Sequence, residues 1–282
     1  MNISVYVASA FSKNNNGGNK AGVVLNEPTL TTQQKMAIAK QLGYAETAFV
    51  TDSKIADYKL EYFTPKEEVD LCGHATIGSF AILMHLNKLH KNQYTIETNS
   101  GVLTITLKDG TIFMEQNRPN FYDIIPPNEL TECFDLNKVN THYQVQIVST
   151  GLKDILIPIK SEIDLHALEP NFEKIREVSA TYDVVGMHLY TFNNDRIICR
   201  NFAPLYDINE EAATGTSNAA LACYLYKNHY LRKENYLFEQ GYSLDSPSEV
   251  LVNLALSNND EIEKVYVGGK GYYCEKKNLT IE

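Results

Sequence analysis

The stretch YFTPKEEVDLCGHATIGSFAILMH, Tyr62–His85, returns in altered form as NFAPLYDINEEAATGTSNAALACYLY, Asn201–Tyr226. Each copy runs from a strand-like end through Phe-x-Pro and an acidic loop to a turn of small polar residues, and then into an apolar helical pattern. Phe63 matches Phe202, and the turn CGHAT matches ATGTS after an insertion of two residues. The repeat predicts two copies of one α+β unit, with a functional site in the cleft between them.

The remaining segments favour short strands and a few helices. Short apolar stretches bounded by Gly, Asn, Asp or Pro are typical of strands and fill most of the chain. Thr31–Leu42 predicts a helix that opens with a threonine cap. Ala75–Leu86 and Ser217–Tyr226 are rich in small and apolar residues, so they predict helices that are buried on most sides.

Charge and cysteine content narrow the range of functions. A net charge of −10 with no basic run argues against a nucleic-acid or anionic-membrane partner, because both need clustered Lys and Arg. No apolar stretch reaches the roughly 18 residues that a membrane helix needs, and MNISVYVASAF lacks the features of a signal peptide. Five scattered cysteines fit reduced thiols better than a disulfide framework. We therefore expect a cytoplasmic protein with a small-molecule partner.

The two turns indicate how an acidic protein could hold an anion. Each turn brings small polar residues to the start of a helix, where unpaired N–H groups carry a partial positive charge. Two such helices, one from each half, could hold a small carboxylate without an arginine. The alternative is that CGHAT and ATGTS are only helix caps with tight turns.

Cys72 and His74 leave several interpretations open. A metal site needs three or four ligands, and these two residues supply two at best, so we expect no metal. Cys72 is a candidate nucleophile, because a helix N-terminus lowers the pKa of a thiol; it is equally well a small buried residue. His74 is a candidate hydrogen-bond donor or proton carrier, with a purely structural histidine as the alternative.

Glu46 is a candidate acid/base residue. It lies at the edge of the strand TAFV, after a Gly-Tyr-Ala bend, among apolar neighbours. Partial burial there would raise the pKa of its carboxyl group, which suits a group that takes and returns a proton near neutrality. The alternative is an exposed glutamate at a strand edge.

Taken together, several blocks of sequence resemble the PhzF family, the phenazine-biosynthesis isomerases of the diaminopimelate epimerase-like superfamily. The resemblance runs essentially end to end, and its order and spacing are specific. The matching blocks are GNKAGVVL, AETAFV, FTPKEEVDLCGHAT, RNFAP, EEAATGTS, EQG and VGG.

The resemblance implies an α+β fold of two similar halves, each a curved sheet or barrel around a central helix, related by a pseudo-twofold duplication. The first half would be residues 1–116, the second 117–266, and 267–282 would return to the first. The Pro-containing stretch around Arg118–Pro127 would be the crossing between them. The family relationship also implies proton transfer without a cofactor, often in a homodimer.

Carried onto this sequence, the family's catalytic residues are Glu46 as general acid/base, His74 and Glu211. The expected substrate-binding residues are Asn19, Cys72, Gly73, Gly215 and Thr216. This chain departs from the family pattern at several positions, and such changes can alter the shape of the pocket and so the substrate. Lys20 replaces a proline, Glu211 an aspartate, Thr216 a serine, and Ser246 an arginine.

Three functions are consistent with these residues. The first is an isomerase in which Glu46 moves a proton on a small carboxylate while N–H groups at Gly73 and Gly215 hold the anion. The second is a two-cysteine amino-acid racemase or epimerase, but the position that should carry the second thiol is Ala212. The third is a non-catalytic module that binds a small ligand.

Overall fold

The computed structural model describes residues 1–27 and 29–281. The chain divides into two compact units: unit 1 is Met1–Glu115 with Gly268–Glu282, and unit 2 is Gln116–Val267. Within the described residues, no helix combines the length and the apolar character required to cross a membrane.

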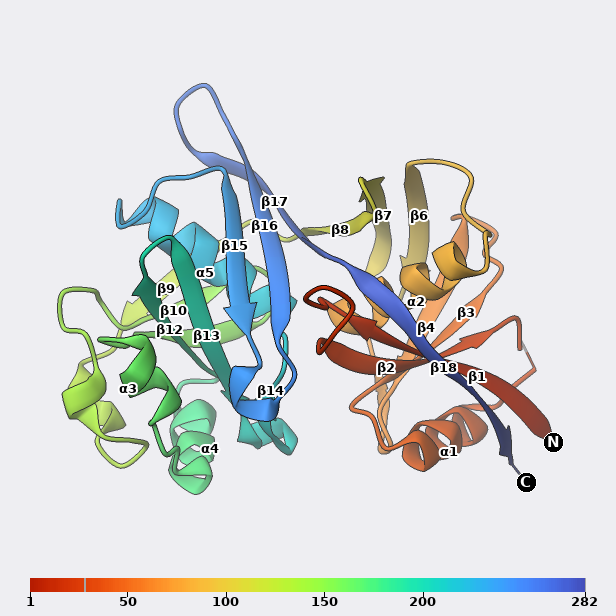
Figure 1. Ribbon diagram of the computed structural model, residues 1–282, viewed down its shortest axis with the longest axis horizontal. Helices are drawn as coiled ribbons and strands as arrows, with labels where there is room; N and C mark the ends of the chain where they lie inside the picture. Colours follow the sequence, from red (N-terminus) through yellow and green to blue (C-terminus); the bar gives the residue numbers. More distant parts are fainter. Residues whose placement is uncertain (28, 282) are drawn as a thin grey trace. The chain divides into compact units, whose positions relative to one another are not determined.

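Unit 1 is a mixed sheet with two helices (Figure 1). Its last strand comes from the C-terminal end of the chain, which pairs antiparallel with the first strand. The N-terminal ammonium group donates to the carbonyl of Ile281 at 2.6 Å, so the two ends of the chain lie together. The elements are β1 (Asn2–Ala10), β2 (Asn19–Leu25), α1 (Thr32–Leu42), β3 (Thr47–Thr51), β4 (Tyr58–Phe63), β5 (Glu68–Val69), α2 (Gly73–His85), β6 (Gln93–Thr98), β7 (Gly101–Lys108), β8 (Thr111–Gln116) and β18 (Gly271–Thr280).

Unit 2 is built in the same way, with short 3₁₀ turns added. The stretch expected as the crossing between the halves, Arg118–Pro127, contains a strand, β9, which pairs antiparallel with β10. The elements are β9 (Asn120–Ile124), η1 (Pro127–Leu130), η2 (Leu136–Lys138), β10 (Gln146–Ser149), β11 (Lys153–Pro158), α3 (Glu162–His166), α4 (Phe172–Thr181), β12 (Gly186–Asn193), β13 (Arg196–Ala203), η3 (Pro204–Tyr206), β14 (Ile208–Glu211), α5 (Gly215–Lys227), β15 (Asn235–Gln240), η4 (Tyr242–Leu244), β16 (Ser248–Leu256) and β17 (Ile262–Gly269).

The strand pairing of unit 1 recurs strand for strand in unit 2. In unit 1, β1–β2, β3–β4, β4–β5 and β6–β7 are antiparallel, and β2–β3 and β4–β6 are parallel. In unit 2, β10–β11, β12–β13, β13–β14 and β15–β16 are antiparallel, and β11–β12 and β13–β15 are parallel. The predicted duplication of one α+β unit is therefore confirmed at the level of topology.

A buried helix forms the centre of each unit. Helices α2 and α5 both have 13 residues, and ten consecutive residues of each are buried. Helix α2 packs on β1, β2 and β18, and α5 packs on β10, β11 and β16. Both helices begin two residues before the apolar pattern does, because their first turns are made of the small polar residues of the predicted turns.

The more exposed helix α1 follows the predicted cap closely. The Thr31 hydroxyl accepts from the Gln34 N–H, and the Thr31 N–H donates to the Gln34 side chain, which together form a capping box. Gly43 ends the helix in the left-handed conformation, at a φ of 71°. Because both ends of α1 are fixed by local bonds, the helix can position the residues that follow it, and these lead to Glu46.

The register of the two units shows which residues correspond. Phe63 lies opposite Thr47 in unit 1, and its repeat partner Phe202 lies opposite Met187 in unit 2. Glu46, one residue before Thr47, therefore corresponds to Gly186. A Cβ at Gly186 would lie 1.9 Å from the carbonyl oxygen of Phe202, so unit 2 has no room for a side chain at the position of Glu46.

Gly186→Ala should lower the free energy of unfolding by about 3 kcal/mol, because the backbone of β13 must move to admit the methyl group. Urea unfolding followed by circular dichroism measures the loss. Gly78→Ala is the matched control, since a Cβ there meets the Cβ of Ala8 at an ordinary 3.4 Å, and it should change the free energy by less than about 1 kcal/mol. Equal losses in the two variants would contradict the steric explanation.

Candidate active site

Three of the predicted site residues come together in unit 1. Glu46 directly precedes β3, Cys72 is the N-cap of α2, and His74 is the second residue of that helix. His74 Nε2 lies 3.1 Å from Glu46 Oε2. Cys72 Sγ lies 3.5 Å from His74 Nδ1 and 3.9 Å from its Nε2. We call these three residues the Glu46–Cys72–His74 cluster.

Hydrogen bonds around the start of α2 hold the cluster in place. Thr76 bonds the Cys72 carbonyl twice, through its N–H at 3.0 Å and its hydroxyl at 2.7 Å. The Thr76 hydroxyl also lies 2.6 Å from the buried Tyr62 hydroxyl of β4. On the other side, the Gly22 N–H of β2 donates to the Glu46 carbonyl at 3.4 Å. Backbone and buried side chains therefore position the cluster from two strands and a helix.

The protonation states of the cluster differ from the sequence prediction. Burial raises the pKa of Glu46, but the adjacent His74 lowers it by more, so the net pKa lies below the ordinary value. The predicted rise is therefore wrong, because the sequence did not show that His74 contacts Glu46. Burial alone would lower the pKa of His74, but Cys72 and Glu46 hold it well above its ordinary value. Glu46 and His74 therefore form a carboxylate–imidazolium pair.

Cys72 is a buried thiol in this environment. Burial raises its pKa, and the Glu46 carboxylate raises it further. The expectation that the helix N-terminus would lower this pKa is wrong, because burial and a neighbouring negative charge oppose the thiolate more than the first turn of α2 favours it. Cys72 is 8% exposed, as the buried alternative required.

The predicted residues of unit 2 gather at the start of α5. Glu211 ends β14, and its Oε2 accepts from the Thr214 hydroxyl at 2.6 Å. Thr214 is the N-cap of α5, yet its side chain does not cap the helix. Gly215 and Thr216 are the first two residues of the helix, and the Thr216 carbonyl accepts from the Thr150 hydroxyl at 3.1 Å.

Two further predicted residues lie at element ends in unit 1. Asn19 opens β2 opposite Ala10 of β1. Gly73 opens α2, and a Cβ there would meet only the end of the Met114 side chain, at 3.6 Å. The N-cap Cys72 makes no side-chain capping bond to the first turn of α2.

Sequence reasoning missed a buried polar network beneath α5. Asp154 of β11 accepts from the Ser217 hydroxyl at 2.7 Å, and Asn201 donates to the same hydroxyl at 3.2 Å. Asn201 also contacts His188 Nδ1 at 3.3 Å, and His188 Nε2 contacts the Asn218 amide oxygen at 3.3 Å. The available signal was the presence of charged or amide side chains inside apolar strands.

Burial shifts both titratable groups of this network toward their neutral forms. It raises the pKa of Asp154 to about 7, with Glu211 adding to the rise and the Ser217 hydrogen bond opposing it. It lowers the pKa of His188 to about 3, although the hydrogen bond with Asn218 opposes the change. His188 is therefore neutral at physiological pH, and a large share of Asp154 is protonated.

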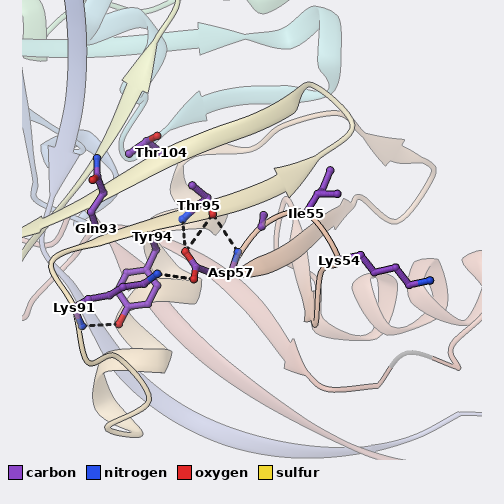
Figure 2. Close-up of a pocket in the computed structure, with 9 residues that line it drawn as sticks. Lys54, Ile55, Asp57, Lys91, Gln93, Tyr94, Thr95 and Thr104 are labelled. Carbon is purple, nitrogen blue, oxygen red and sulfur yellow. Dashed lines mark hydrogen bonds and ion pairs between the residues drawn. The ribbon is translucent and has the colours of Figure 1, made fainter.

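Two surface hollows of unit 1 lie away from the cluster. The larger, of about 490 Å³, is lined by Asp57, Lys91 and neighbouring residues (Figure 2). Asp57 accepts from Lys91 Nζ at 2.6 Å and from the Thr95 N–H and hydroxyl at 2.8 and 3.1 Å, so its charge is already paired. The second hollow, of about 330 Å³, includes Asp52 and His90 in its lining. Neither lining includes a residue of the cluster.

Known structures identify the fold. A PhzF-family phenazine biosynthesis protein of Bacillus anthracis superposes with a TM-score of 0.91 at 26% identity, over 100% of both chains. A hydroxyproline epimerase of Agrobacterium vitis superposes with a TM-score of 0.66 at 9% identity, covering 99% of this chain and 91% of the epimerase. The predicted epimerase-like α+β fold is confirmed.

Sequence relatives identify the class and the family. The uncharacterized isomerase YfhB of Bacillus subtilis is 30% identical over 287 residues, which cover 96% of this chain and 97% of YfhB. An uncharacterized isomerase of Clostridium acetobutylicum is 29% identical over a match that covers 99% of this chain and 98% of that protein. The chain is therefore an isomerase with an epimerase-like fold. The model of the phenazine biosynthesis-like (PhzC-PhzF) family matches residues 8–277, and the chain belongs to that family.

Proposed function

We propose that this isomerase moves a proton on a small carboxylate-bearing substrate, without a cofactor, and that Glu46 is the general acid/base. The observation that carries the proposal is the 3.1 Å contact between Glu46 Oε2 and His74 Nε2 at the start of α2. A carboxylate in this position is ready to accept a proton, and a histidine in contact with it can stabilise or share the charge that moves.

In the proposed reaction, Glu46 removes a proton from a carbon close to the substrate carboxylate and returns it to another carbon. The N–H groups in the first turn of α2, beginning at Gly73, are suited to an anion because the N-cap side chain does not occupy them. They would also stabilise the negative charge that develops as the proton leaves. Glu211, beside the start of α5, stays a predicted catalytic residue of unit 2.

The differences between the repeated units support one acid/base centre over a pair of thiols. The helix N-caps correspond, so Cys72 matches Thr214 and not Ala212, the position expected from the sequence. Neither Thr214 nor Gly186, the counterpart of Glu46, carries a group that could act as a second thiol. Cys223 lies inside α5 and is fully buried. These features disfavour the two-cysteine racemase.

Deuterium exchange tests the proposed function. We expect that wild-type protein, incubated in D₂O with a panel of small carboxylates, will place deuterium on carbon in at least one of them, as read by NMR. The panel comprises dihydro-hydroxyanthranilates, amino acids and hydroxy acids. Exchange that depends on Glu46 but survives in Cys72→Ala supports the proposal. Exchange lost in Cys72→Ala and retained in Glu46→Gln would instead support thiol chemistry, and binding of a panel member without exchange would support a ligand-binding module.

A further inference from the structure

The cluster in unit 1 brings together three kinds of metal ligand. The sequence places two donors, Cys72 and His74, next to each other, and two are too few for a metal site. The fold supplies the third: one carboxylate oxygen of Glu46, one ring nitrogen of His74 and the sulfur of Cys72 all lie within 4.8 Å of one another. Glu46 comes from the start of β3, 26 residues before Cys72 along the chain, so the spacing in the sequence could not show it.

The distances within the cluster suit a tetrahedral ion. Ligand atoms around a tetrahedral zinc ion with ordinary bond lengths are separated by about 3.3–3.6 Å. Through His74 Nε2, the nitrogen–oxygen distance is 3.1 Å and the sulfur–nitrogen distance is 3.9 Å. All three ligand atoms lie within 4.8 Å of one another, so binding requires side-chain rotations that bring the sulfur closer to the other two donors.

The surroundings leave the carboxylate oxygen available to an ion. Glu46 Oε2 is buried and, among the described residues, has no hydrogen bond of good geometry; its contact with His74 is an ion pair. The Glu46 side chain is 16% exposed, against 7% for His74 and 8% for Cys72, so Glu46 is the most accessible member.

We propose that the Glu46–Cys72–His74 cluster binds one Zn²⁺ ion and that the bound ion inhibits the isomerase. A thiolate, an imidazole and a carboxylate form a mixed donor set that suits Zn²⁺ and Co²⁺ and not Mg²⁺ or Ca²⁺, which prefer oxygen ligands alone. Three protein ligands leave the fourth position of the ion open to water. On binding, the Cys72 thiol proton and one ring proton of the His74 imidazolium pass to the solvent, so the sulfur takes up the ion as a thiolate and His74 as a neutral imidazole.

The inhibitory part of this inference rests on the proposed function. A Glu46 oxygen bonded to zinc cannot accept a proton from a substrate carbon, and a His74 nitrogen bonded to zinc no longer pairs with that carboxylate. Zinc would therefore compete with proton transfer at the same atoms, and a chelator would restore it. Binding itself does not depend on any reaction.

Cobalt titration of the whole protein tests the binding. Co²⁺ at a thiolate-containing tetrahedral site gives a sulfur-to-cobalt charge-transfer band in the near ultraviolet and strong visible absorption. We expect both in wild-type protein, saturating at one equivalent, and we expect Zn²⁺ to displace the cobalt. Cys72→Ala should lose the charge-transfer band and weaken Zn²⁺ binding at least about 100-fold, since removing a ligand costs no less than removing an outer-shell partner.

The matched control is Cys274→Ala, which removes the other cysteine of unit 1, a partly exposed one. It should keep the full cobalt spectrum and the zinc affinity of the wild type. His74→Asn and Cys72→Ser provide second variants if Cys72→Ala fails to fold, and each should weaken zinc binding. A wild-type spectrum without the charge-transfer band, or the same band in Cys72→Ala, would overturn the site.

A separate measurement distinguishes failure of the inhibition from failure of the proposed function. With a compound that the wild type labels in D₂O, equimolar Zn²⁺ should suppress the exchange and a chelator should restore it. If zinc binds as described and exchange continues unchanged, the inhibition is wrong while the site stands. If no compound is labelled even after chelation, the proposed function fails and the cobalt result still decides the site.

Discussion

Glu46→Gln is expected to slow deuterium exchange by roughly 10²–10⁴-fold with any compound that the wild type labels. The substitution keeps the size of the side chain but removes the oxygen that accepts the proton, and general acid/base catalysis contributes about this factor. It also removes the negative partner of His74 Nε2, 3.1 Å away. NMR measurement of the exchange rate at saturating substrate, with both proteins at the same concentration, gives the ratio directly.

Two further variants make this result specific to Glu46. Glu46→Asp keeps the negative charge but shortens the side chain by one methylene group. Displacement of a catalytic group by about 1 Å can slow a reaction on the order of 10²-fold. Glu173→Gln removes an exposed carboxylate from the first turn of α4 and should exchange at the wild-type rate. Exchange by Glu46→Gln within a factor of two or so of the wild type would mean that another group takes the proton.

Asp154→Asn should change how stability depends on pH. The pKa of Asp154 is raised to about 7 from 3.8, so between those values the folded protein holds a proton that the unfolded chain has released. This contribution to stability is fully present below about pH 4 and is lost as pH rises through 7. In the variant, the side chain at position 154 cannot ionise. Relative to that variant, the free energy of unfolding of the wild type should fall by up to about 4 kcal/mol between about pH 4 and pH 7.

Urea unfolding at a series of pH values from 4 to 8 or so measures the difference between the two proteins. The comparison must use the variant, because His188, with its pKa lowered to about 3, produces the opposite trend: stability is lost as pH falls below the ordinary range of histidine. Asp245→Asn is the control, since it replaces an exposed carboxyl of the same unit at a left-handed position that asparagine also adopts. If the free energies of unfolding of wild type and Asp154→Asn change in parallel with pH, the pKa of Asp154 is not raised in the folded protein.

The fold was predictable because its signals are local or repeated. The match of Phe63 with Phe202 indicated a duplication, and the small and apolar residues after each turn predicted the two buried helices. The threonine cap of α1 was read from neighbouring residues alone. The helix starts at Gly73 and Gly215 were not predicted, because a polar first turn carries no apolar periodicity.

The chemistry of the site was less predictable because it depends on contacts between distant parts of the chain. The residues Glu46, Cys72 and His74 were each identified, yet only the fold shows that His74 lowers the pKa of Glu46 and that Glu46 completes a set of three metal ligands. The network around Asp154 joins three strands to α5, and no short motif marks it. The roles of Asn19, Gly73, Gly215 and Thr216 in binding substrate stay predictions.

The position of β18 sets the order in which the molecule can be completed during synthesis. Unit 2 is one continuous stretch, so all of it has been made before the ribosome reaches Gly268. Unit 1 is started before unit 2 but lacks β18, which pairs with β1 and packs on α2, until residues 271–280 have been made. Unit 1, which precedes unit 2 in the chain, is thus the one that finishes folding last, and the helix that carries Cys72 and His74 is fully covered only after unit 2 has been made.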